Sequence, residues 1–142
     1  MKKRVVALLL FCSASISGQG RPETQGILVE YNNISIGKSF AFNDYEIRFV
    51  DVLSDSRCPK AVMCIVAGEA VVKVKIYKSG KRIIEKTLTF TPTVFLPNSK
   101  GNLYDTELLK VTGVALYPYP VADNQIQKEN YSLKLLIEEL VE

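Results

Sequence analysis

The chain has 142 residues, a formal net charge of +3 at neutral pH and no histidine. Lys2, Lys3 and Arg4 account for the positive excess, because without them 15 basic residues balance 15 acidic ones. This balance excludes the broad basic surface that is typical of nucleic-acid binding. The lack of histidine removes the commonest general base in enzymes.

The N-terminus is typical of a secretory signal peptide. Three basic residues precede a short apolar run over 5–11, and residues 12–20 are small and polar. The apolar run is much shorter than the ~20 residues that cross a bilayer, and we predict no transmembrane helix. We therefore expect a signal peptide over 1–18, a flexible lead-in over 19–25 and one β domain over 26–142.

Three fates of the leader are open. Ser15 and Ser17 fit the small-x-small rule, which predicts cleavage after Ser17 or Gly18. Alternatively, Cys12 becomes the lipidated first residue of a bacterial lipoprotein, although Phe11 stands where a small residue is preferred. An uncleaved leader is the third alternative. The first two predict an exported protein in the periplasm, on the outer membrane or outside the cell.

Period-two patterns of hydrophobic residues predict an all-β domain. The clearest strand covers 65–77 and points Ala70, Val72, Val74 and Ile76 to one side. A Ser-Gly turn over 78–81 joins it to a strand over 82–90, which makes a hairpin. Further strands are expected over 27–31, 39–42, 45–53, 93–96 and 107–117.

The C-terminal segment over 131–141 fits two structures. Alternation favours a strand, through Tyr131, Leu133, Leu135 and Ile137. A helical stripe also fits, and the Leu, Lys and Glu content favours helix. We expect a strand, because every earlier element needs a sheet partner. About seven short strands without βαβ alternation predict an antiparallel β-sandwich or a small barrel.

Cys58 and Cys64 are the only cysteines after the leader. An even number of cysteines in an exported chain favours a disulfide, which here would staple a short loop between two strands. A zinc site would need about four ligands, and this part of the chain has no histidine and no third cysteine. A redox pair is more often spaced Cys-x-x-Cys. We therefore expect a disulfide and no metal or other cofactor.

The cysteine loop resembles a family of small exported bacterial proteins of unknown function, many of which look like lipoproteins. The matching residues are Asp55-Ser56-Arg57-Cys58-Pro59, Cys64 and Ala67-Gly68-Glu69-Ala70. The similarity covers most of the domain, but only this loop is specific. Val66 departs from the family pattern, which usually has Trp there. The resemblance implies export and a disulfide, and it implies no activity.

Three charged residues beside the cysteines are candidate site residues. Asp55 can form an Asx-turn into the loop, and Arg57 can pair with Asp55 or Glu69 and so pin the strand ends. In this structural interpretation, the three residues shape a corner of the fold. In the functional interpretation, Arg57 presents a cation to an anionic ligand and Glu69 orients it.

A second candidate is the aromatic segment Tyr117-Pro118-Tyr119-Pro120. Its prolines favour an extended backbone. Tyr117 and Tyr119 either close the end of the core or form a surface for a partner peptide or glycan.

The expected function is binding or scaffolding of an envelope protein or glycan by an exported, non-catalytic β-domain. Two alternatives stay open. A carboxylate-based hydrolase of envelope glycans would need two carboxylates about 5–10 Å apart in a cleft. A secreted inhibitor that uses the Cys58–Cys64 loop as a rigid wedge would need an exposed tip over 60–63.

Overall fold

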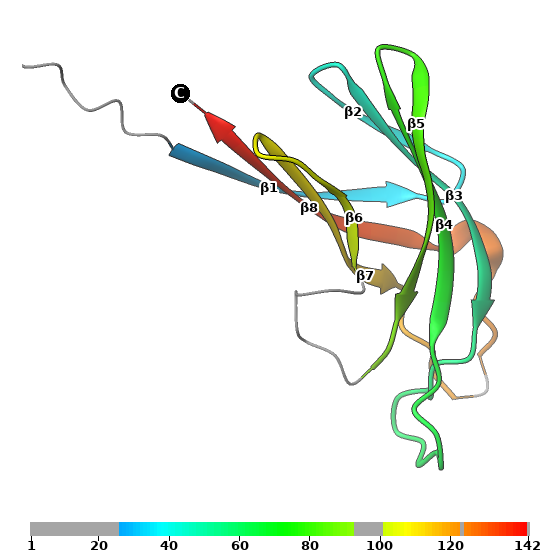
Figure 1. Cartoon of the computed structure of the whole chain (residues 1–142). Coiled ribbons are helices and arrows are strands. Elements are labelled where there is room, and N and C mark those ends of the chain that lie inside the picture. Colours follow the sequence, from blue (N-terminus) through cyan, green and yellow to red (C-terminus); the bar gives the residue numbers. More distant parts are fainter. Residues whose placement is uncertain (1–25, 93–100, 123, 142) are drawn as a thin grey trace, which may run out of the picture.

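The computed structural model describes residues 26–92, 101–122 and 124–141. Over these residues, two four-stranded antiparallel sheets pack face to face (Figure 1). The sheet with order β1-β8-β7-β6 contains β1 (Gly26–Ser35), β6 (Asn102–Asp105), β7 (Leu109–Tyr117) and β8 (Ser132–Val141). The sheet with order β2-β3-β4-β5 contains β2 (Ser39–Phe42), β3 (Tyr45–Asp55), β4 (Ala70–Lys78) and β5 (Lys81–Phe90). The predicted antiparallel sandwich is confirmed, with eight strands rather than about seven.

The chain builds the two sheets in three stages. β1 begins the first sheet, β2 to β5 then form the second sheet as a meander, and β6 to β8 return to the first. A short 3-10 turn, η1 (Lys128–Asn130), leads into β8. β8 then pairs with β1 along its whole length, from Gly26 opposite Val141 to Ser35 opposite Ser132. The first and last strands therefore lie side by side.

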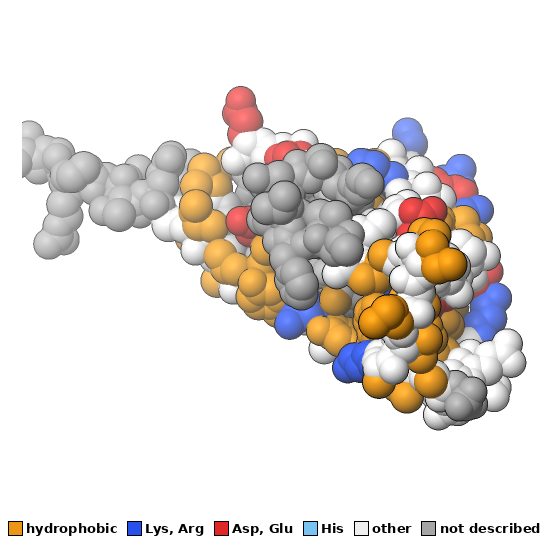
Figure 2. Space-filling view, turned by 90° about the horizontal axis from the view of Figure 1, so that it is seen from below, with side chains coloured by type: hydrophobic (Ala, Val, Ile, Leu, Met, Phe, Trp, Pro, Cys, Tyr) orange, Lys and Arg blue, Asp and Glu red, His pale blue; other side chains and the backbone are white. Residues whose placement is uncertain are grey.

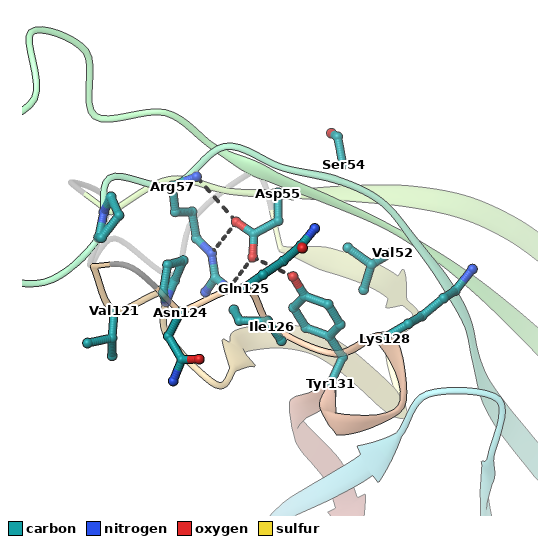
Figure 3. Close-up of a pocket in the computed structure, with 12 residues that line it drawn as sticks. Val52, Ser54, Asp55, Arg57, Val121, Asn124, Gln125, Ile126, Lys128 and Tyr131 are labelled. Atoms are coloured by element: carbon teal, nitrogen blue, oxygen red, sulfur yellow. Dashed lines mark hydrogen bonds and ion pairs between the residues drawn. The ribbon is translucent and has the colours of Figure 1, made fainter.

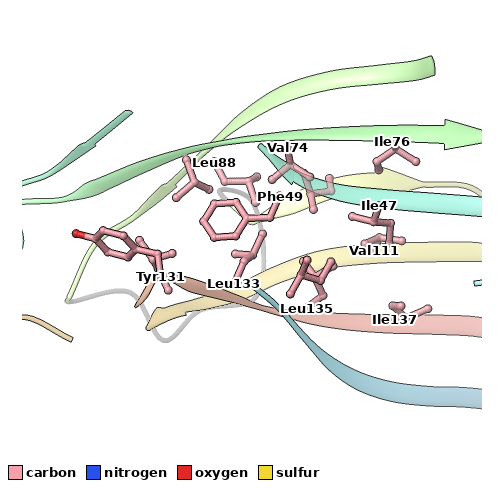
Figure 4. Close-up of a cluster of buried hydrophobic side chains, with 14 of the residues drawn as sticks. Ile47, Phe49, Val74, Ile76, Leu88, Val111, Tyr131, Leu133, Leu135 and Ile137 are labelled. Carbon is pink, nitrogen blue, oxygen red and sulfur yellow. The ribbon is translucent and has the colours of Figure 1, made fainter. Parts of the chain in front are cut away.

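The core lies between the sheets and follows the period-two pattern (Figure 4). The inward row of β4 is buried as predicted, at Ala70, Val72, Val74 and Ile76. β8 buries Leu133, Leu135 and Ile137 against it. The segment over 131–141 is thus a strand, as expected, because strand geometry places alternate residues on one face.

Some predicted boundaries are wrong. β4 begins at Ala70 rather than at residue 65, and Ile65 and Val66 are exposed loop residues. The reason is Gly68, whose φ of +68° interrupts an extended strand. β7 begins at Leu109 rather than at 107, and the expected strand over 93–96 lies outside the described residues.

Two bulges in β3 determine the direction of Asp55. The register with β4 shifts between Phe49 and Asp51 and again between Val52 and Ser54. Each extra residue reverses the side to which the following side chains point, and the second reversal cancels the first. Asp55 consequently lies opposite the buried Ala70, on the inner side of the sheet.

Candidate functional site

A loop of residues 56–69 joins β3 to β4 and projects beyond the end of the sandwich (Figure 1). Ser56 N and Ser56 Oγ donate to the Glu69 carbonyl oxygen, at 2.7 and 3.0 Å. Glu69 N donates in return to Ser56 Oγ, at 3.1 Å, and Cys58 N donates to the Ala67 carbonyl oxygen, at 2.8 Å. These bonds hold the two ends of the loop together.

Gly68 is sterically required at the base of this loop. Its backbone has a positive φ, and a Cβ atom there would overlap the carbonyl oxygen of Ser56. Any other residue would force the two ends of the loop apart. This steric requirement explains why a glycine stands in the Ala-Gly-Glu-Ala segment.

The loop has two further anchors. Cys58 and Cys64 form the expected disulfide, with their Cα atoms 6.0 Å apart. Lys60 N donates to the Pro120 carbonyl oxygen at 3.0 Å, which ties the loop to the segment that follows β7. The loop is thus fixed by the hydrogen bonds at its base, by its disulfide, and by a hydrogen bond to the segment between β7 and β8.

The Arg57 side chain lies beneath the loop and is 6% exposed. Its Nε and Nη2 donate to the two carboxylate oxygens of Asp55, at 2.8 and 2.6 Å. Nη1 donates to the Leu116 carbonyl oxygen at 2.7 Å, and Nη2 also donates to that of Pro118 at 3.0 Å. Because Leu116 belongs to β7, the guanidinium joins the two sheets.

The Asp55 carboxylate accepts two more hydrogen bonds. Arg57 N donates to Oδ1 at 3.2 Å, which is the geometry of the expected Asx-turn. The Tyr131 hydroxyl donates to Oδ2 at 3.0 Å (Figure 3). Asp55 and Glu69 were the two partners expected for the Arg57 side chain. It pairs with Asp55, whereas Glu69 is exposed and contributes to the corner through its backbone.

These contacts change two pKa values. Burial alone would raise the pKa of Asp55, but the hydrogen bonds and charge of Arg57 outweigh it and lower that pKa below its ordinary value. Burial, followed by the hydrogen bond to Asp55, raises the pKa of Tyr131 to about 12. Asp55 is therefore ionised and Tyr131 protonated at neutral pH. An ion-paired carboxylate with a lowered pKa is a poor general base.

The two tyrosines of the aromatic segment have different environments. Tyr119 is half-buried, and its ring centroid lies 5.1 Å from Arg57 Cζ and 5.7 Å from Lys60 Nζ. Both distances are within the range of cation–π contacts. Tyr117, in contrast, is exposed. Tyr119 thus packs on the corner, and Tyr117 is the one of the pair that faces solvent.

An open pocket of about 670 Å³ adjoins the corner (Figure 3). Its lining consists of Val52, Ser54, Asp55, Arg57, Pro59, Pro120, Val121, Asn124, Gln125, Ile126, Lys128 and Tyr131. Among the described residues of this lining, Asp55 is the one carboxylate, and Arg57 already neutralises it. Within 26–92, 101–122 and 124–141, no group of three or more His, Cys, Asp and Glu residues is placed to hold a metal ion.

The tip of the loop is apolar and exposed. Met63 and Ile65 are 100% and 105% exposed, Val66 is 74% exposed and Val62 is 43% exposed. Figure 2 views the molecule from the side on which the loop projects, and hydrophobic side chains face the viewer there. Contiguous apolar side chains on a protein surface mark interaction sites.

Sequence analysis did not identify every residue of the corner. Tyr131 was assigned only to the core row, and the carbonyl groups of Leu116 and Pro118 were not considered. The hydroxyl group of Tyr131 could have indicated a polar contact in the sequence, because a buried tyrosine usually hydrogen-bonds a polar group. Cys12, the candidate lipidation site, lies outside the described residues.

Comparison of the chain with protein-family models, curated proteins and solved structures finds no match. No helix among the described residues is long and apolar enough to cross a membrane. The fold and the corner define a β-sandwich domain that carries a disulfide-clamped apolar loop.

Proposed function

We propose that the protein is an exported, non-catalytic binding domain and that residues 60–66 of the clamped loop insert into an apolar pocket of a partner protein. The observation that carries this proposal is the full exposure of Met63 and Ile65 on a loop that is fixed at several points. A loop that is already ordered loses little conformational entropy on binding. An apolar tip also suits a protein pocket better than the hydroxyl-rich surface of a glycan.

Export is supported by three observations of different kinds. The leader has the order of a signal peptide, the cysteine loop resembles an exported family, and Cys58 and Cys64 form a disulfide. Disulfides persist in oxidising compartments such as the periplasm and the extracellular space. The proposed location is therefore the periplasm, the outer membrane or the medium.

The proposed role of Asp55, Arg57 and Tyr131 is to position the loop. The Arg57 side chain donates four hydrogen bonds within the protein, which leaves little donor capacity for an anionic ligand. Loss of one of these bonds would loosen the attachment of the loop to β7.

Of the two alternatives, the inhibitor is compatible with the proposal, because the tip over 60–63 that it needs is exposed. The glycan hydrolase has no comparable support, since the described residues of the pocket lining include one carboxylate, that of Asp55, and it is paired with Arg57. A hydrolase of this kind needs two.

Capture from an envelope extract tests the proposal. The bait variants are the wild type, Met63→Ser/Ile65→Ser, and the control Ile83→Ser/Val114→Ser, which alters exposed apolar residues outside the loop. Surface substitutions change stability by only about 0.5 kcal/mol, so all three baits remain folded. We expect the wild type and the control to capture the same protein, and the tip variant to lose at least about 90% of it, which corresponds to ~1.4 kcal/mol.

A photo-crosslinker at position 63 identifies the partner directly. Equal capture by the wild type and the tip variant would overturn the proposal, and so would hydrolysis of an envelope glycan that disappears in Asp55→Asn.

A further inference from the structure

We propose that two copies of this chain associate through β1, in antiparallel register about a two-fold axis at Val29. The two β1-β8-β7-β6 sheets then become one continuous eight-stranded sheet. This surface is separate from the clamped loop and does not depend on the function proposed for it.

The four edge strands of the sandwich differ in their protection against pairing. β2 and β6 have only four residues each. β5 is longer but carries four charged residues, Lys81, Arg82, Glu85 and Lys86. Short edge strands and charged side chains are the usual devices that prevent edge-to-edge association. β1 has ten residues, no proline, no lysine and one charged residue, Glu30.

β1 also exposes apolar side chains on both of its faces. The exposed fractions are 68% for Ile27, 47% for Leu28, 51% for Val29 and 59% for Tyr31. Figure 2 shows hydrophobic side chains at the end of the sandwich that adjoins the grey N-terminal residues. Within the described residues, no strand pairs with the free edge of β1.

The backbone shows which residues can pair across this edge. Ile36 N donates to the Tyr131 carbonyl oxygen at 2.9 Å, and the register between β1 and β8 is unbroken from Gly26 to Ser35. Since hydrogen-bonding groups alternate sides along an antiparallel strand, the odd-numbered residues of β1 direct N–H and C=O groups to the free edge. The available groups are those of Ile27, Val29, Tyr31 and Asn33, whereas the Ser35 carbonyl oxygen already accepts a hydrogen bond from Lys38 N at 3.0 Å.

Charge and apolar pairing select the register. An axis at Val29 places Val29 opposite itself and Ile27 opposite Tyr31 of the second copy. An axis at Glu30 would place two glutamates directly opposite each other, which is destabilising. An axis at Tyr31 would place Ile27 and Val29 opposite the polar Ser35 and Asn33.

The area that β1 exposes is sufficient for a reversible dimer. Four large side chains that are each about half exposed or more present on the order of 400 Å² of apolar surface per copy. With the strand backbone, two copies reach the ~1,000 Å² at which specific interfaces begin. Because the same strand serves both copies, the interface is isologous and closes at two.

Sedimentation velocity over about a hundredfold range of concentration tests this interface, with the protein purified from producing cells. We expect the wild type to pass from monomer to dimer as concentration rises. Val29→Lys places two lysines opposite each other, and we expect it to raise the dimer Kd at least about tenfold. The matched control is Ile83→Lys on β5, an edge that is already charged, and it should dimerise like the wild type.

A charge-swap experiment separates a loss of pairing from a loss of folding. Val29→Glu and Val29→Lys should each dimerise at least about tenfold more weakly than the wild type when alone, and should form a heterodimer when mixed, because opposite charges then meet at the axis. A wild type that stays monomeric throughout would overturn the proposal. Undiminished dimerisation of Val29→Lys, or no heterodimer in the mixture, would overturn it as well.

Discussion

Arg57 has hydrogen-bond acceptors from two parts of the chain, the Asp55 carboxylate two residues before it and the distant carbonyl groups of Leu116 in β7 and Pro118 just after β7. Such a set suits the planar guanidinium fork and would not suit the compact ammonium group of lysine. Asp55 was predictable as a partner, because it lies only two residues from Arg57 in the sequence. The far partners were not, because backbone carbonyl groups carry no side-chain signal.

Asp55→Asn tests this corner at the level of a single residue. The substitution leaves Arg57 buried without its counter-ion, and we expect the free energy of unfolding at neutral pH to fall by about 3–5 kcal/mol. Chemical denaturation measures the change. Asp44→Asn, at an exposed carboxylate 3.9 Å from Lys78 Nζ, is the control and should cost less than about 1 kcal/mol.

The same variant should change the acid dependence of stability. The pKa of Asp55 is lower in the folded protein than its ordinary value of 3.8, so the folded state favours the ionised form. This stabilisation is fully present above pH values near 3.8 and is lost as the pH falls through the lower, folded pKa. The Tm of the wild type should therefore fall more steeply in acid than that of Asp55→Asn, and parallel Tm curves would contradict this assignment.

At the level of elements, local patterns predicted most of the strands, but they misplaced the start of β4 and missed β6. The β4–β5 hairpin was predictable because Ser79 and Gly80, both with positive φ, form its turn. Ile65 and Val66 continue the hydrophobic run of β4 in sequence, and for this reason they were assigned to the strand. They are instead exposed on the loop. A hydrophobic run that extends past a structural glycine can therefore indicate a surface for binding rather than a longer strand.

Cys58→Ser tests the contribution of the Cys58–Cys64 disulfide to the stability of the domain. The chain-entropy model gives a loop of this length about 2–2.5 kcal/mol, and loss of native disulfides typically costs 2–5 kcal/mol. We expect a lower Tm for the variant, and a similarly lowered Tm for the wild type in reductant. The variant itself should be insensitive to reductant, which is the internal control. A wild-type Tm that is unchanged by reductant would show that the clamp does not stabilise the domain.

At the level of the whole molecule, the class of fold was predictable but the pairing of its strands was not. Alternation identifies strands one by one, whereas the contact between β1 and β8 joins the two ends of the described chain. Tyr131 is a second example. Its place in the inward-facing row of the C-terminal segment was predictable, but its hydrogen bond to Asp55, on the opposite sheet, was not. The corner depends on these non-local contacts, and they arise only when both sheets are assembled.

At the level of the whole molecule, one measurement tests the proposed export, namely mass spectrometry of the purified protein before and after alkylation. Cleavage after Ser17 or Gly18 would remove Lys2, Lys3, Arg4 and Cys12, so the mature chain should be near neutral and should contain two cysteines. Because these two form the disulfide, alkylation without reduction should add no mass, and alkylation after reduction should add two groups. A lipid-modified Cys12 at the N-terminus would identify the lipoprotein route and would still mean export. An intact leader together with three freely alkylated thiols, those of Cys12, Cys58 and Cys64, would contradict both export and the clamped loop. A reduced loop in the cytoplasm would lack the disulfide that holds its tip in place.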